Sequence, residues 1–390
     1  MHIVIFSIIL NQHQVAVADE LWKQTNHRFA FVELENIGDT KGGTEDYSTR
    51  PYLLQVWKNP DAKRQAFEWA ISAEVCVFSG IRSLPFQRAR LKKGLLSFEM
   101  SERWLKQGWK NLLSPRLLKN LWNYHIGYWS RKPLYKLCCS AFCAHDQYVL
   151  HTFKNKCYKW GYFIKVDKIV IQENSSWSFE KRQALLMWCS RYLKWKHPEL
   201  PIMMAARLKN EGYRFVLDMY GCGEYEEHAK SLVRDLSVDD IVHFVGTKPN
   251  NELLKDMRQH DIFLFTSDQN EGWGAVANES MSNGCILVAS DAIGSVPYLV
   301  KNEETGILFH SPKSSSGFDN PDLMSLDDLC AKVKNLLDNP SLMKRISRQG
   351  ITQMQEVWSP QVAVYRLLTL IDCLRQGNDT VFDDGPCSKA

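Results

Sequence analysis

Residues 263–279 read FLFTSDQNEGWGAVANE. The apolar run at the start predicts a buried strand over 262–266, and a helix is expected over 275–282, where Asn283-Gly284 would end it. The loop between them places Glu271 just before a Gly-Trp-Gly turn. Glycines let backbone approach an anion closely, and a helix start offers free N–H groups to a diphosphate. The stretch therefore predicts an anion-binding site at the carboxyl end of a strand.

The whole second half of the chain alternates short apolar runs with amphipathic segments. Strands are expected at 185–189, 214–220, 241–245, 262–266 and 285–289, with helices at 199–211, 224–236, 251–259 and 275–282. In the first half, strands are expected at 2–8, 28–34, 73–79 and 95–99, with helices at 15–24 and from about 101. Apolar strands separated by helices predict parallel sheets covered on both faces, with ligands beyond the carboxyl ends of the strands.

Glu271 and Glu279 flank the predicted anion site with seven residues between them. Two carboxylates at that spacing can accept hydrogen bonds from two sets of hydroxyls, as a ligand with a sugar on one side of its phosphates and a ribose on the other requires. Two basic residues and two glycines follow earlier strands of this half: Arg191, Lys196, Gly221 and Gly223. Together these residues resemble glycosyltransferase family 4, retaining enzymes of the GT-B fold, although Ser190 stands where the family usually has glycine.

The resemblance implies a role for each matching residue. Arg191 and Lys196 would hold the donor diphosphate and neutralise charge as the bond to the sugar breaks. Glu271 would hold hydroxyls of the transferred sugar and complete the catalytic set, and Glu279 would hold the ribose. The other expected donor-binding residues are Gly272, Trp273, Gly274, Gly221 and Gly223. The resemblance implies no cofactor and no metal, because the two cations would supply the electrostatic stabilisation.

The resemblance and the strand pattern together predict an α/β protein of the GT-B type, with two Rossmann-like, doubly wound parallel-sheet domains facing a cleft. We expect an acceptor-side domain over 1–165 and a nucleotide-sugar-binding domain over 166–358. A helix over 359–375 would cross back to the N-terminal domain. Residues 376–390 are polar and are expected to be disordered.

Three residues of the first half are candidates for the acceptor side. His13 lies in the polar stretch after the first strand, where it could orient or deprotonate an acceptor hydroxyl or be an ordinary loop histidine. Glu102 and Arg103 follow the strand at 95–99 and could contact the acceptor.

Residues 101–136 combine eight Lys/Arg and one acidic residue with seven Trp and Tyr. Basic residues among aromatic ones are typical of a surface that binds an anionic membrane. The alternative is a domain face packed by aromatic residues with its basic groups in water. Nucleic acid is not expected as a partner, because no recognition motif accompanies the charge.

Charge is unevenly divided along the chain. Residues 1–165 carry 24 Lys/Arg against 13 Asp/Glu (+11), and 166–390 carry 24 against 31 (−7). The basic half would suit a phosphate-bearing acceptor or an anionic surface. Eleven scattered cysteines without a C-x-x-C pair predict reduced thiols rather than a metal site. With no transmembrane run and no basic residue before the apolar run at 3–10, we expect a cytoplasmic protein, or one peripheral on the inner face of the cell membrane.

The predicted reaction transfers a hexose-type sugar, with retention of configuration, from a nucleotide-diphosphate donor. Residues 158–163, YKWGYF, resemble a stretch of the bacterial polysaccharide-assembly members of the family. A glycan or lipid-linked acceptor in capsule, lipopolysaccharide or exopolysaccharide synthesis is therefore expected. The alternatives are a sugar-nucleotide epimerase or hydrolase on the same fold, and a catalytically silent scaffold. A dehydrogenase is excluded, because no G-x-G-x-x-G follows the first strand.

Overall fold

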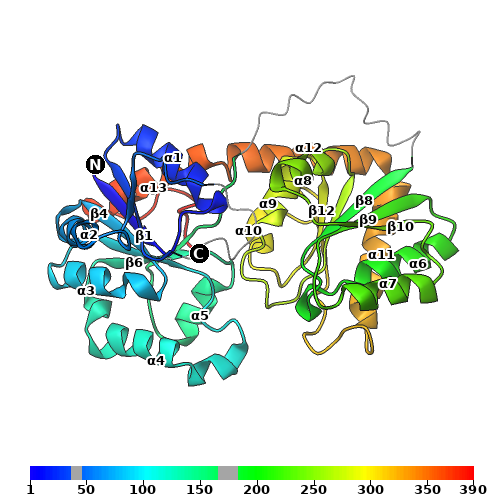
Figure 1. Ribbon diagram of the computed structural model, residues 1–390, viewed down its shortest axis with the longest axis horizontal. Coiled ribbons are helices and arrows are strands. Elements are labelled where there is room, and N and C mark those ends of the chain that lie inside the picture. Colours follow the sequence, from blue (N-terminus) through cyan, green and yellow to red (C-terminus); the bar gives the residue numbers. More distant parts are fainter. Residues whose placement is uncertain (37–45, 166–182) are drawn as a thin grey trace. The chain divides into compact units, whose positions relative to one another are not determined.

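The computed structural model describes residues 1–36, 46–165 and 183–390. The chain divides into two compact units, Met1–Lys165 with Val357–Ala390, and Val166–Glu356. The predicted start of the second domain, at residue 166, lies outside the described residues. Each unit contains its own parallel sheet with helices packed around it (Figure 1).

The first unit is built on a seven-stranded sheet in the order β3-β2-β1-β4-β5-β6-β7. The strands are β1 (Ile3–Ser7), β2 (Phe29–Glu33), β3 (Leu53–Gln55), β4 (Val75–Ser79), β5 (Ser97–Ser101), β6 (Leu134–Cys138) and β7 (Cys157–Lys159). The helices are α1 (Gln12–Gln24), α2 (Pro60–Ser72), α3 (Leu84–Lys92), α4 (Pro115–Leu121), α5 (Cys143–Val149) and α13 (Pro360–Arg375). The strand order reverses between β1 and β4, so the loops after these two strands border the position where ligands bind in such sheets.

The second unit has a six-stranded sheet in the order β10-β9-β8-β11-β12-β13. Its strands are β8 (Ala184–Cys189), β9 (Phe215–Tyr220), β10 (Val242–Gly246), β11 (Ile262–Phe265), β12 (Ile286–Ser290) and β13 (Ile307–Phe309). Its helices are α6 (Glu199–Asn210), α7 (Glu226–Asp235), α8 (Asn250–Met257), α9 (Val276–Ser282), α10 (Val296–Leu299), α11 (Leu323–Asp338) and α12 (Pro340–Glu356). Here the order reverses between β8 and β11, which places the loops after these strands at the expected ligand position.

The predicted strands of both halves are present close to their expected bounds, which confirms the α/β class. The strand β6 was not predicted, because its Lys136 interrupts the apolar pattern. In the fold Lys136 is fully buried, and its Nζ lies 2.7 Å from Oε1 of Glu99 on the neighbouring strand β5. The ion pair makes burial of the lysine possible, and it cannot be deduced from local sequence.

Two local expectations in the first unit are wrong. No regular α-helix begins near 101, because the buried Asp146 binds both the Arg103 guanidinium and the backbone N–H of Leu105 and holds this segment in an irregular path. The polar stretch after β1 is not a loop but the first turn of α1. Asn11 caps that helix by accepting a hydrogen bond from the backbone N–H of His13.

The C-terminal residues 376–390 are ordered, which contradicts the expected disorder. The backbone N–H of Lys159 donates to Ser388, and those of Cys387 and Ala390 donate back to Lys159 and Cys157. Because β7 is the edge strand of its sheet, this segment covers backbone groups that would otherwise be unpaired. Its polar composition hid the role, since the bonds are made mainly by backbone.

Deleting residues 377–390 should therefore destabilise the first unit. Edge bonds of β7 would be lost, and the Tyr158 hydroxyl would lose Asp379, to which it donates at 2.8 Å. We expect a loss on the order of 2–4 kcal/mol in the free energy of unfolding, measured by urea titration of the full chain. The control Val381→Ser changes an exposed side chain of the same segment and should have no effect. An unchanged urea midpoint in the deletion variant would contradict the stabilising role of this segment and favour the expected disorder.

Candidate functional site

Lys196 and Glu271 form an ion pair where the second sheet reverses its strand order. Lys196 lies in a short 3-10 turn after β8, and Glu271 in the loop after β11. Both side chains are almost fully buried, and the Ser267 hydroxyl donates to the same Glu271 oxygen at 3.2 Å. The Lys196 ammonium also lies 4.2 Å from the centre of the Trp195 ring. The structure thus brings together two of the three predicted catalytic residues.

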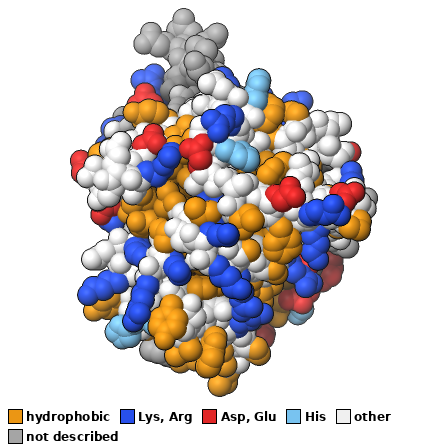
Figure 2. Space-filling view, turned by 90° about the vertical axis from the view of Figure 1, so that its left-hand side faces the viewer, with side chains coloured by type: hydrophobic (Ala, Val, Ile, Leu, Met, Phe, Trp, Pro, Cys, Tyr) orange, Lys and Arg blue, Asp and Glu red, His pale blue; other side chains and the backbone are white. Residues whose placement is uncertain are grey.

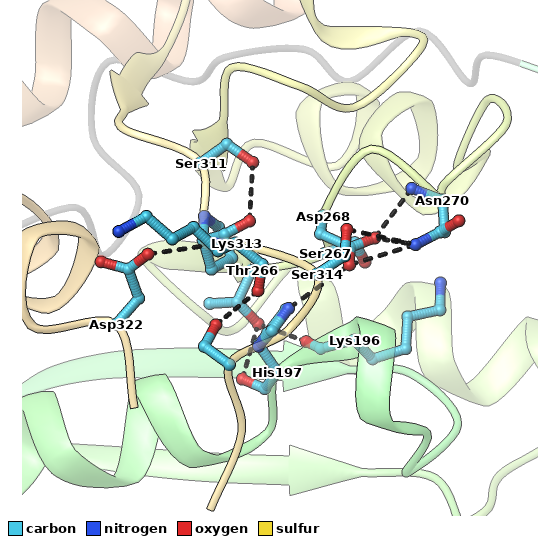
Figure 3. Close-up of polar contacts among 12 residues, drawn as sticks. Lys196, His197, Thr266, Ser267, Asp268, Asn270, Ser311, Lys313, Ser314 and Asp322 are labelled. Carbon is cyan, nitrogen blue, oxygen red and sulfur yellow. Dashed lines mark hydrogen bonds and ion pairs between the residues drawn. The ribbon is translucent and has the colours of Figure 1, made fainter. Parts of the chain in front are cut away.

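The backbone that carries Lys196 is tied to the end of β11. The Thr266 hydroxyl donates to the carbonyl oxygen of Lys196 at 2.7 Å (Figure 3). It also accepts a hydrogen bond from Trp188 Nε1 at 2.9 Å. Trp188 is itself a fully buried residue of β8. These bonds join the ends of two adjacent strands, so the Lys196 main chain is held by the sheet rather than by a free loop.

His197 forms a buried charge cluster directly beside Lys196. Its Nδ1 lies 2.8 Å from Glu199, its Nε2 lies 3.6 Å from Asp268, and its backbone has a left-handed φ of 48°. Burial opposes the imidazolium, but the carboxylates of Asp268 and Glu199 outweigh it and raise the pKa of His197 to about 9. The side chain is therefore charged at neutral pH and holds the loops after β8 and β11 together.

Arg191 lies in the loop after β8, and its side chain is exposed. This loop packs against the loop after β9 at van der Waals distance, because Gly221 has a φ of 118° and a Cβ there would lie 1.9 Å from the Ser190 carbonyl oxygen. Gly223 makes a similar close approach to Tyr192. The two predicted donor-binding glycines thus shape the backbone on either side of Arg191.

The Gly-Trp-Gly turn is set by packing. Gly274 has a φ of 80°, and a Cβ there would lie 2.4 Å from the Phe265 ring. The Trp273 side chain is buried, and its Nε1 donates to Asn278 at 2.9 Å, so it anchors the turn to α9 rather than facing a ligand. Gly272, which directly follows Glu271, has no side chain, and the Trp273 side chain is buried. The backbone of the turn is therefore the part that is available for binding.

Glu279 lies in α9, is buried, and has its pKa raised to about 7 by desolvation, against which a hydrogen bond from Asn250 acts. The Cys189 thiol at the end of β8 is influenced electrostatically by both Glu279 and Lys196. Glu279, predicted to bind the ribose, and Lys196, predicted to bind the diphosphate, therefore both lie near the end of β8.

A hollow of about 460 Å³ lies at the switch point of the first unit. It is lined by the loops after β1 and β4 and includes Glu102 and Arg103. The Tyr162 hydroxyl donates to Glu102 at 3.0 Å, while Arg103 is paired with Asp146. Arg103 is therefore held by a structural carboxylate even though it lines the hollow.

His13 lines a separate, largely apolar cavity and stacks on Tyr162, with ring centres 5.9 Å apart. Burial lowers the pKa of His13 to about 4, so its ring is neutral at physiological pH. Gln14 and Tyr162 line both the cavity and the hollow. The three predicted acceptor-side residues therefore lie around one region of the unit, but His13 does not line the larger space.

Sequence reasoning missed His197, Glu199 and Asp268, as well as Gln14 and Tyr162. The only available signal was position: the first four lie within three residues of a predicted site residue, and Tyr162 lies in the stretch at 158–163. Their contacts depend on the pairing of β8 with β11 and on the packing of residues 160–163.

Two Rossmann-like units, each with its own parallel α/β sheet, define the GT-B class of fold. Residues 171–353 match the family model described as glycosyl transferases group 1, so this part of the chain belongs to that family. HepE of Anabaena, solved in complex with UDP, superposes with a TM-score of 0.69 at 14% identity over 96% of this chain and all of that one.

Curated relatives match over parts of the chain. A D-inositol 3-phosphate glycosyltransferase of Corynebacterium aurimucosum is 29% identical over 37% of this chain and 35% of its own length. The amylovoran biosynthesis glycosyltransferase AmsK of Erwinia amylovora is 31% identical over 26% of each chain. The chain therefore aligns with about a third or less of these relatives. None of the helices described here is both long and apolar enough to cross a bilayer.

The Glu279 carboxyl predicts a pH-dependent stability. Folding raises the pKa of Glu279 from 4.5 to about 7. Its contribution to the free energy of unfolding is therefore fully present below pH 4.5 and is lost as the pH rises through about 7. Glu279→Gln should therefore stabilise the protein at pH 8 by up to roughly 3 kcal/mol and have little effect at pH 4.5. Urea unfolding at the two pH values measures this, with the exposed Glu304→Gln as control. Equal effects at both pH values would contradict the buried, neutral carboxyl.

Proposed function

We propose that the chain is a retaining glycosyltransferase that moves a hexose-type sugar from a nucleotide-diphosphate donor to a glycan or lipid-linked acceptor in cell-surface polysaccharide synthesis. The observation that carries the proposal is the nearly buried Lys196–Glu271 ion pair at the switch point of the second sheet. The family match over residues 171–353 supports the chemistry, and the amylovoran relative supports the pathway class.

On the donor side, the ion pair provides both halves of a sugar-phosphate site. A diphosphate can replace Glu271 as the partner of Lys196, which frees the carboxylate to accept hydrogen bonds from sugar hydroxyls. Negative charge grows on the leaving phosphate as the glycosidic bond breaks, and the Lys196 ammonium, whose main chain is held by Thr266, would stabilise it. The exposed Arg191 guanidinium supplies a second cation from the same loop.

The nucleoside would lie beside Glu279 and Asn250, at the α9 side of the site. A buried carboxyl whose pKa is about 7 binds ribose hydroxyls as an acceptor when ionised, and their hydrogen bonds favour that form. Donor binding should therefore lower the pKa of Glu279.

The acceptor would occupy the hollow of the first unit. Glu102 and Tyr162 offer a hydrogen-bonded carboxylate and hydroxyl at its wall, and Gln14 offers an amide. His13 is neutral and packs on Tyr162, so its ring can position the acceptor-contacting tyrosine or accept a proton. In retaining transfer on the same face, the leaving phosphate takes the acceptor proton, which gives His13 an orienting role.

Two other functions use the same fold. An epimerase or hydrolase would consume donor without any acceptor, whereas the proposed transferase needs one for full turnover. A silent scaffold would have lost its site cations or carboxylates, but Arg191, Lys196, Glu271 and Glu279 are all present.

Lys196→Ala and Glu271→Ala should each lower transfer by on the order of 10²–10³-fold, because each removes charge stabilisation or sugar contacts at the reacting bond. The measurement is product formation from a panel of UDP- and GDP-sugars. Lys194→Ala removes an exposed lysine from the same 3-10 turn and should retain activity. Turnover near wild type in either site variant would exclude the assigned site.

His13→Ala should reduce transfer by about tenfold or more while leaving the donor Kd unchanged, because His13 belongs to the unit assigned to the acceptor. His13→Gln, which keeps a polar side chain against Tyr162, should restore part of the loss. Donor binding by calorimetry and initial rates at varied acceptor concentration separate the two effects. Equal losses in donor affinity and in transfer would contradict a role of His13 in acceptor binding.

A further inference from the structure

Residues 106–132 form a surface segment of the first unit whose outer face the proposed chemistry does not use. The segment contains a 3-10 turn (Gly108–Leu113), α4, a π-helical turn (Trp122–Ile126) and a second 3-10 turn (Trp129–Arg131). Its inner face packs on the core through Leu117, Tyr124 and Trp129, which are buried. We call its outer face the amphipathic face.

The amphipathic face exposes large apolar side chains in a row. Leu118, Trp122 and Ile126 follow one another at four-residue intervals and are 55%, 65% and 55% exposed. An α-helix that passes into a π turn keeps such a spacing on one side, and the Gly127 N–H closes the turn on the Trp122 carbonyl at 2.9 Å. A Cβ on Gly127 would lie 2.5 Å from the Asn123 oxygen, so glycine is needed there.

Two further exposed apolar residues lie in the same segment. Leu113 is 85% exposed and Tyr128 is 58% exposed, with the Arg131 guanidinium 5.0 Å from the centre of the Tyr128 ring. In Figure 1, α4 lies at the lower end of this unit, and the same end in Figure 2 shows hydrophobic side chains beside Lys and Arg. Clustered exposed apolar residues mark an interaction surface rather than chance exposure.

The charge around the row is of one sign. Lys110, Arg116 and Lys119 are exposed, and no ion pair holds them within the described chain. Residues 101–136 contain Glu102 as their one acidic residue, and Glu102 already faces Lys106 at 3.7 Å. The basic groups are therefore available to an anionic partner.

The combination favours a lipid surface over the other partners. Protein interfaces deplete lysine at their centres, and nucleic acids gain stacking from aromatic rings but nothing from leucine and isoleucine. Aliphatic side chains next to Trp, Tyr and unpaired Lys/Arg match an interfacial element whose apolar row enters the bilayer while its cations meet anionic headgroups.

We propose that the amphipathic face seats the first unit on an anionic bilayer. Arg116, Leu117 and Asn120 of α4 also line the 460 Å³ hollow, so docking would bring the hollow close to the headgroups. If the proposed function holds, the acceptor is then a lipid-anchored molecule with an anionic head, taken from the membrane surface.

Flotation of the full chain with vesicles tests the proposal. It should bind phosphatidylcholine vesicles that contain phosphatidylglycerol and not phosphatidylcholine alone, and binding should fall as salt rises. Lys110→Glu with Lys119→Glu should lower the bound-to-free ratio by more than about tenfold, since each basic residue near such a surface contributes roughly fivefold. Leu118→Ser with Trp122→Ser should lower it independently.

Matched controls lie on the same unit. Lys63→Glu with Arg64→Glu makes the same charge change on α2, and Tyr365→Ser removes an exposed aromatic residue from α13; both should float as wild type does. Absence of wild-type binding to the anionic vesicles, equal losses in the controls, or vesicle binding unchanged in both test variants would overturn the proposal. Concentration-dependent dimers abolished by Leu118→Ser with Trp122→Ser, without vesicle binding, would assign the face to a second copy. Because flotation needs no catalysis, its result is independent of whether Lys196 and Glu271 support transfer.

Discussion

The ion pair between Lys196 and Glu271 is the constraint around which the second unit is arranged. Two opposite charges with little access to water gain from each other only if their geometry is held, and removing one leaves the other uncompensated. The geometry is held by the sheet, because Thr266 at the end of β11 binds the Lys196 carbonyl and Trp188 of β8. Such a pair is weak evidence for stability, and in the proposed function an anion would replace one partner while sugar hydroxyls bind the other.

His197, the residue after Lys196, also takes part in buried ion pairs. Its imidazolium lies between Glu199 and Asp268, so the loops after β8 and β11 are joined by charge as well as by hydrogen bonds. Because its pKa is raised to about 9, the cluster contributes fully below pH 6.5, and its contribution falls as pH rises through 9. A left-handed backbone at a non-glycine residue is strained, and this cluster offsets that strain beside the proposed catalytic lysine.

The strands and the Gly-Trp-Gly turn could be predicted from the sequence, because the spacing of apolar residues and the backbone freedom of glycine depend only on neighbouring residues. Gly274 could be recognised in this way and Gly221 through the family resemblance, and both prove sterically obligatory. The buried Lys136–Glu99 pair and the ordered C-terminal segment could not, since each depends on a partner far away in the chain. For the same reason Glu279 could be selected as a binding residue while its shifted pKa could not, because desolvation is created by the fold.

In both units the strand order reverses once, and the loops at that reversal carry the candidate site residues. The residues at the two reversals differ in kind. In the second unit the switch lies between β8 and β11, and the loops there carry cations and carboxylates suited to a charged donor. In the first unit the switch lies between β1 and β4, and its hollow is walled partly by α4. The same helix lines this hollow with Leu117 and exposes Leu118 on its other side. Under the two proposals, the inner face of α4 would help to hold the acceptor, and its outer face would bring the unit to the membrane that supplies the acceptor.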